Sequence, residues 1–257
     1  MTSERAVQIG IDRLIRLDWL ERSSSLVLAG NTTLEIKHAL QHDLCNSFKP
    51  GVTEKRGSLD KTLTILMKVW LTTPNELFDL RNAGLDFIRQ MPCGHRKVIH
   101  WGMLSAVYPF WANVARQTGR LINLQGNIVA TQVQRRMKEQ YGERQTVSRT
   151  TQRVLRSYVD WGVLRETCIV GVYEPAVPIA VDDRELAAWL IEAVLLSSIN
   201  GPTTLKSLID STALFPFRLP RITANELLAS SKRLDVMTHN LDDVLVVLKR
   251  SMTSQST

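Results

Sequence analysis

One stretch near the middle of the chain combines an apolar face and a basic face in a single helical pattern. The apolar stripe, at helical spacing, holds Val147, Thr151, Val154, Leu155 and Tyr158. The opposite stripe holds Ser148, Arg149, Gln152, Arg153 and Arg156. We expect a helix over residues 147–161 that begins at Thr146 or Ser148, both good N-cap residues, and ends at Trp161-Gly162. Such a helix needs a core on one side and solvent or a ligand on the other.

The segments before this helix have a definite order. A helix ends at Leu121–Leu124, Gln125–Asn127 forms a turn, and Ile128–Val129 is a short strand. A further helix is expected at Ala130–Tyr141, where Gly142 stops it as a C-cap glycine does.

The segments after the helix complete the pattern. We expect a strand at Val163–Val170, a turn-rich tip at Gly171–Pro178 and a returning strand at Ile179–Val181. Helix, short strand, helix, tight turn, helix and two-stranded ribbon is the order of a winged helix-turn-helix.

The rest of the chain is predicted to be mainly α. Before residue 115 the expected helices are Leu34–Leu44, Ser58–Trp70, Pro74–Met91 and His100–Val114, the last interrupted at Pro109. After residue 182 a long apolar helix follows Asp182 or Asp183, and then come helices at Leu205–Ile209 and Thr223–Ser231 and a hairpin of Leu234–Met237 with Val244–Leu248 across Asn240. We therefore expect a helical N-terminal domain at 1–115, a winged helix-turn-helix at 116–181, a C-terminal winged-helix-like domain at 182–250 and a disordered tail at 251–257.

Positive charge is concentrated in the middle of the chain. Between Arg116 and Arg165 there are ten Lys and Arg residues and three acidic residues. This excess equals the formal net charge of the whole chain, which is +7, so the remainder is neutral. A local excess of this kind is typical of a surface that binds a polyanion.

The basic face suits double-stranded DNA. Arg can donate two hydrogen bonds to guanine, and Gln can pair with adenine, so Arg149, Gln152, Arg153 and Arg156 could read bases, while Ser148 suits a phosphate. The neighbouring segments offer further contacts to the DNA backbone, namely Arg135, Arg136, Lys138, Arg144, Gln145 and Thr146. The expected wing has no Lys or Arg in Val170–Ile179, so any action of the wing would fall to Tyr173, backbone or protein contact.

A second hypothesis is a protein–protein scaffold that uses winged-helix folds as docking modules. The uncharged wing, the apolar run Leu186–Ile199 and the helical N-terminal half favour it. Duplex binding across a range of salt concentrations separates the two hypotheses.

No metal, cofactor or enzymatic activity is predicted. His38, His42 and Cys45 are spaced to share one helix face, but no fourth zinc ligand is near them, and surface positions explain them as well. The chain holds no phosphate-binding glycine loop, nucleophile elbow or zinc-protease motif. Three scattered cysteines, no apolar leader and no membrane-length apolar run predict a cytoplasmic protein.

The chain also resembles the BrxA family of bacteriophage-exclusion (BREX) defence systems over about residues 10–165. The residues that carry this resemblance are the helix Val147–Tyr158, the exit Trp161-Gly162-Val163-Leu164 and the aromatic Tyr108–Trp111. The resemblance implies a non-enzymatic, DNA-binding component of a bacterial phage-defence system, with other defence proteins as partners.

Overall fold

The computed structural model describes residues 8–48, 57–198, 203–238 and 244–249. Within these residues the protein is mostly helical with small sheets, which confirms the predicted mainly α class. The predicted tail at 251–257 and the predicted turn at Asn240 lie outside the described residues.

The N-terminal half is a group of helices in which α2 (Leu17–Leu28), α4 (Ser58–Trp70) and α5 (Phe78–Gln90) pack against α6 (Lys97–Val107), and α3 (Thr33–Leu44) packs on α2 and α4. Short 3-10 turns lie at Cys45–Ser47, Asn75–Leu77 and Cys93–His95. The helices predicted at Leu34–Leu44 and Ser58–Trp70 are confirmed. The α-helix predicted to open at Pro74 begins instead at Phe78, because a 3-10 turn follows the proline.

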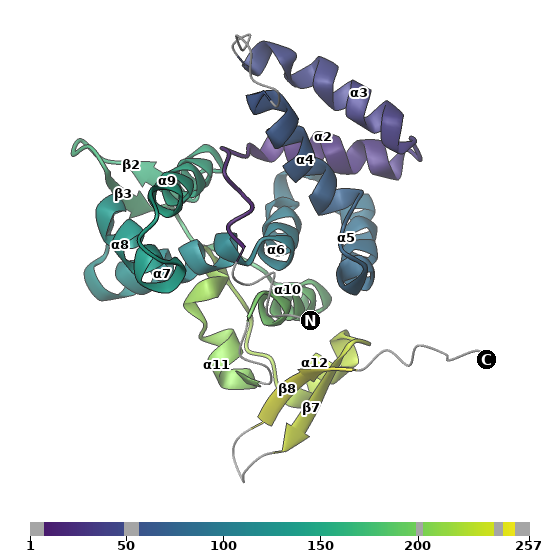
Figure 1. The fold of residues 1–257 in the computed structure, drawn as a ribbon. Coiled ribbons are helices and arrows are strands. Elements are labelled where there is room, and N and C mark those ends of the chain that lie inside the picture. Colours follow the sequence, from purple (N-terminus) through teal and green to yellow (C-terminus); the bar gives the residue numbers. More distant parts are fainter. Residues whose placement is uncertain (1–7, 49–56, 199–202, 239–243, 250–257) are drawn as a thin grey trace.

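A central unit follows, at the left of Figure 1. It consists of α7 (Pro109–Gln125), β1 (Ile128–Val129), α8 (Ala130–Tyr141), α9 (Gln145–Asp160), β2 (Leu164–Glu166) and β3 (Val172–Pro175). The three strands form an antiparallel sheet in the order β1-β3-β2. The predicted order of elements up to α9 is confirmed, although the predicted domain boundary at residue 116 falls within α7.

The two-stranded ribbon is shorter than predicted. Val163–Val170 does not continue as a strand, because Gly171 adopts a φ of 81° and the chain reverses over Thr167–Gly171. Within this turn the Thr167 hydroxyl accepts a bond from Ile169 N and donates to the Val172 carbonyl, and the Ile169 carbonyl accepts a bond from Val172 N. The returning strand is therefore β3, while β4 (Ile179–Ala180) pairs in parallel with β6 (Phe217–Arg218).

The C-terminal unit repeats the order of the central one. Its elements are α10 (Arg184–Ser197), β5 (Thr203–Thr204), α11 (Leu205–Ile209), a 3-10 turn (Thr212–Leu214), α12 (Ala224–Ser230), β7 (Leu234–Thr238) and β8 (Val244–Leu248). Its sheet order, β5-β8-β7, corresponds to β1-β3-β2 of the central unit. The structure confirms the predicted strands at Leu234–Met237 and Val244–Leu248. It also confirms Asp183 as the N-cap of α10, because the Asp183 side chain accepts a bond from Leu186 N.

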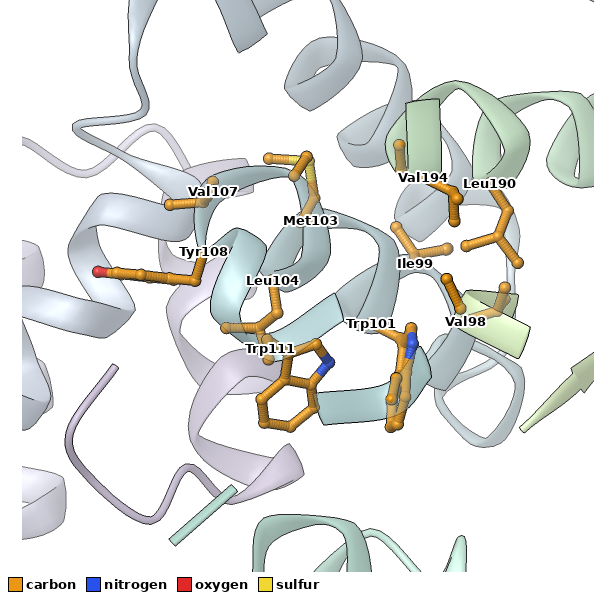
Figure 2. Packing of buried hydrophobic residues seen from close by; sticks show 14 of the residues in the cluster. Val98, Ile99, Trp101, Met103, Leu104, Val107, Tyr108, Trp111, Leu190 and Val194 are labelled. Carbon is orange, nitrogen blue, oxygen red and sulfur yellow. The ribbon is translucent and has the colours of Figure 1, made fainter. Parts of the chain in front are cut away.

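The core runs through α6 and α10, which pack against each other. Every residue from Val98 to Val107 is buried, and Figure 2 shows Val98 and Ile99 facing Leu190 and Val194 of α10. The apolar run in α10 therefore belongs to the core and is not an open docking surface. This run no longer favours the hypothesis of a protein–protein scaffold. In the described parts of the chain we find no helix with the length and apolarity to cross a membrane.

A buried polar contact joins α2, α4 and α6. The Trp70 indole N–H donates to Nδ1 of His100 at 3.2 Å, so the other imidazole nitrogen, Nε2, carries the proton of the neutral ring. Nε2 lies 3.2 Å from Oε1 of Glu21, whose other oxygen accepts a bond from Arg96. No local pattern predicts this role for His100, because its partners lie 30 and 79 residues away along the chain.

We expect this contact to make stability depend on pH. Burial lowers the pKa of His100 more than the nearby Glu21 carboxylate raises it. The folded pKa is thus below the unfolded value of about 6.5, so the contribution of His100 is present above that pH and is lost as the pH falls through the folded pKa. For one proton the loss is at most about 1.4 kcal/mol per pH unit.

The measurement is the free energy of unfolding of the protein and of His100→Gln, in urea, between pH 8 and pH 5. The variant should lose less stability than the parent as the pH falls in this range. Burial by itself would raise the pKa of Glu21, but the contacts with His100 and Arg96 outweigh burial and lower that pKa. The stability that Glu21 contributes is therefore lost at a more acidic pH than the stability that His100 contributes. If the free energy of unfolding fell by the same amount in both proteins between pH 8 and pH 5, the predicted contribution of His100 would be contradicted.

Candidate nucleic-acid interface

The predicted apolar face of α9 is confirmed as part of the core. Val147, Val154, Leu155 and Tyr158 are completely buried, as is Thr151. The Tyr158 hydroxyl donates to the Trp111 carbonyl at 2.8 Å, which fixes α9 against α7. The helix that carries the basic residues is therefore held rigidly along its length.

The opposite face of α9 presents a continuous stripe of polar and basic side chains. Gln145, Arg149, Gln152 and Arg156 follow one another at intervals of four, three and four residues. Arg149 and Arg156 are exposed, and no carboxylate of the described residues lies within 4.0 Å of either guanidinium. These two side chains are the uncompensated charges of the stripe.

Gln152 is bonded at both ends of its amide. Its Nε2 donates to the Tyr173 hydroxyl at 3.1 Å, and its Oε1 accepts from Gln134 at 3.0 Å. The amide thus links α9 to α8 and β3. Tyr173 is itself buried, so of the alternatives named for the wing, backbone and protein contact are the ones that its surface offers.

Arg153 points to the side of the stripe, toward the N-terminal segment. Its Nη1 donates to the Asp12 carbonyl, and the Asp12 carboxylate lies 4.0 Å away. The same segment bonds α9 again, because Ile15 N donates to the Ser157 hydroxyl at 2.9 Å and the Trp161 indole donates to the Ile15 carbonyl. No local pattern could have indicated these contacts, since they join residues more than 140 positions apart.

The N-terminal segment also adds charge beside α9. Arg16 is exposed and lies 3.8 Å from Asp160, the last residue of the helix. Sequence reasoning missed Arg16 as a neighbour of α9, because the two segments are far apart along the chain.

The predicted backbone-contacting residues lie on α8 and on the turn before α9. Arg135 pairs with Glu139 at 3.6 Å, and Lys138 pairs with Glu143 at 2.9 Å. Pairs this exposed contribute little to stability and can exchange their partner for a phosphate. Arg136 is half-buried, whereas Arg144, Gln145 and Thr146 are exposed and Ser148 is half-buried.

The start of α9 differs from the prediction. The helix begins at Gln145 with Arg144 as N-cap, so Thr146 and Ser148 lie in its first turn and are not caps. Gly142, with a φ of 90°, and the bond from Arg144 N to the Gly142 carbonyl reverse the chain earlier than expected. The first turn holds no acidic side chain and no side-chain cap, which leaves the positive end of the helix dipole uncovered.

The ribbon beside α9 holds one basic and two acidic side chains, and its turn ends in apolar side chains. Arg165 on β2 stands opposite Glu174 on β3. At the turn, Ile169 and Val170 are 63% and 100% exposed. These two residues were missed, because the sequence pattern assigned them to a strand.

The candidate metal ligands do not form a site. In the part of the chain that is described, no three His, Cys, Asp or Glu side chains are grouped to hold an ion. His38, His42 and Cys45 are all exposed, and the Cys45 thiol donates to the His42 carbonyl at 3.0 Å.

Comparison with known proteins adds no relative. No protein-family model, curated protein or solved structure matches this chain.

Proposed function

We propose that this protein binds double-stranded DNA through the exposed face of α9. The observation that carries the proposal is the pair Arg149 and Arg156, exposed on one stripe of a rigidly held helix without a carboxylate partner among the described residues. The helix is buried on one face, and its exposed face presents two guanidinium groups without a carboxylate partner. Such groups match the regularly spaced negative charge of a nucleic-acid backbone.

The surrounding elements support a winged helix-turn-helix. The order α7-β1-α8-α9-β2-β3, with sheet order β1-β3-β2, is the order of such a fold, in which α9 would be the recognition helix. In this arrangement the second helix of the pair lies in the major groove while the first crosses the DNA backbone. Arg135 and Lys138 of α8 and Arg144 of the turn are then the side chains nearest the flanking phosphates.

The intramolecular hydrogen bonds of two side chains favour contact with the DNA backbone over recognition of bases. Gln152 would have to give up its bonds to Gln134 and Tyr173 to pair with adenine, and Arg153 would have to leave Asp12. Breaking a satisfied hydrogen bond network costs free energy that a new contact must first offset. We therefore propose Arg149 and Arg156 as the main contacts, with Arg153 and Gln152 in supporting positions.

The experiment is a titration of a fluorescent duplex at several salt concentrations. We expect binding whose log affinity falls linearly with log salt concentration, with a slope of about 0.9 for each phosphate contacted. A single-stranded RNA of the same length serves as a competitor. Absence of duplex binding even at low salt, or an affinity that does not change with salt, would refute the proposal.

The resemblance to the BrxA family suggests a biological role for the proposed DNA binding. On that basis the protein would be a non-enzymatic, DNA-contacting component of a bacterial phage-defence system, acting with other defence proteins. Its support is the resemblance in element order and in the few residues named above. Loss of phage resistance on deletion of the gene, restored by the parent chain, tests this part separately.

A protein-docking module is the second candidate, and one observation favours it. Ile169 and Val170 expose apolar side chains at the end of the β2–β3 ribbon, with Val177 exposed nearby in the sequence. If docking is the function, the parent should not bind duplex DNA at moderate salt, and Ile169→Ser with Val170→Ser should abolish a partner complex. DNA binding that fails in the parent together with a complex that fails in this variant would favour docking over the leading proposal.

A further inference from the structure

A small polar cavity lies where the central unit meets the C-terminal unit. Its volume is about 300 Å³. One wall consists of Asn113 and Arg116 of α7 and Gln140 of α8. The other wall comes from the end of α10, β5, α11 and the residues just after it, and its side chains are mainly Ser and Thr. Among the described residues, no acidic side chain lines the cavity.

Arg116 brings a positive charge into this cavity without a negative partner. Its Nη1 donates to Oδ1 of Asn113, and its Nη2 reaches the Ser198 hydroxyl at 3.5 Å. Burial lowers the pKa of the guanidinium, and the ionisable group that acts in the opposite direction is the Tyr141 phenol rather than a carboxylate. Within the described ranges, no carboxylate oxygen lies within 4.0 Å of Arg116. A largely buried cation needs a counter-charge, since neutral hydrogen bonds offset only part of its desolvation.

We propose that this cavity binds a small molecule carrying an oxyanion, either a phosphate or a carboxylate, with Arg116 as its counter-charge. A guanidinium presents two parallel N–H donors to such a group. The hydroxyl and amide groups of the walls supply further donors for its oxygens. The volume is at the lower end of the range for ligand pockets, which limits the ligand to a small metabolite and excludes a polymer.

The position of the cavity connects the ligand to α9. Nδ2 of Asn113 donates to the Tyr141 hydroxyl at 2.6 Å, and Tyr141 is the last residue of α8. The Tyr141 carbonyl in turn accepts a bond from Arg144, the residue at which α9 begins. An anion bound to Arg116 is therefore two side chains away from the turn that orients α9, while its other contacts lie in the C-terminal unit.

The test is the melting temperature of the full chain in inorganic phosphate, in acetate and in sodium chloride at matched ionic strength. DNA is not needed, so the result is independent of the proposed function. We expect a saturable rise in phosphate or in acetate beyond that in chloride, and the anion that acts identifies the ligand group. Arg116→Gln should lose the anion-specific rise, whereas Arg120→Gln, an exposed position on the same helix, should keep it.

A second variant covers the case in which Arg116→Gln does not fold. Gln140→Glu places a carboxylate in the same cavity, and we expect a higher melting temperature without added anion and no further anion-specific rise. Equal melting temperatures of the parent in all three salts would overturn the proposal. So would an anion-specific rise that persists in Gln140→Glu or in a folded Arg116→Gln.

Discussion

Reversal of two charges, Arg149→Glu with Arg156→Glu, is expected to reduce the affinity for duplex DNA by ~100-fold or more at moderate salt. Loss of one hydrogen bond to a charged group costs about 1.5–3 kcal/mol, and about 1.4 kcal/mol is a factor of ten. The introduced carboxylates would add repulsion from the backbone. Both side chains are exposed, so helix content should not change. Binding is measured by fluorescence anisotropy and folding by circular dichroism.

A matched control separates this local effect from the change in net charge. Lys206→Glu with Arg221→Glu alters the charge by the same amount at exposed positions of the C-terminal unit. We expect this variant to bind duplex DNA within a few-fold of the parent. Equal losses in the two variants would mean that α9 is not the site and that only the total charge matters. Adding Arg153→Glu should increase the loss but also disturb the contact with Asp12, so the double variant is the cleaner test.

Trp101→Ala is expected to destabilise the fold by about 3–5 kcal/mol, the usual cost of removing a large aromatic side chain from a core. Trp101 is 1% exposed and stands at the centre of an aromatic cluster, visible beside Trp111 in Figure 2. Its ring centroid lies 4.6 Å from that of Tyr158 on α9 and 5.7 Å from that of Phe217 on β6. The cluster thus joins all three parts of the chain, and its loss should unfold them together.

Urea unfolding measures this effect, with Trp101→Phe and Leu34→Ala as controls. The Trp101 indole N–H is buried without a hydrogen-bond partner among the described residues, so its replacement by Phe removes an unsatisfied donor as well as volume. We expect Trp101→Phe to cost less than half as much as Trp101→Ala. Leu34 is 62% exposed, and its replacement should stay within about 0.5 kcal/mol. Near-parent stability of Trp101→Ala would show that the cluster does not unite the fold.

The sequence predicted those parts of the fold that local patterns determine. The bounds of α8 agree because Gly142 ends the helix, and the two faces of α9 agree because a single periodicity defines them. The C-terminal strands were recognisable from their β-branched and apolar residues. The ribbon was misplaced because the chain turns at Thr167–Gly171, where Gly171 has a positive φ, rather than in the Pro-containing segment after it.

The candidate site depended more on contacts between distant segments. The sequence indicated that Arg149 and Arg156 lie on an open face, but it could not show that Asp12 holds Arg153 or that Gln134 and Tyr173 hold Gln152. Such contacts divide a uniform row of polar side chains into free and occupied members. The polar cavity around Arg116 was missed for the same reason, since its walls come from segments that meet only in the folded chain.

The central claim is that α9 lies against the duplex, and site-specific photo-cross-linking tests it most directly. A photo-reactive residue in place of Gln145, exposed at the start of α9, is compared with one in place of Glu185, exposed at the start of α10. Both proteins are irradiated with a labelled duplex at a concentration that saturates binding. We predict a DNA cross-link from position 145 and none above background from position 185. Bound DNA that cross-links at position 185 but not at position 145 would contradict the account.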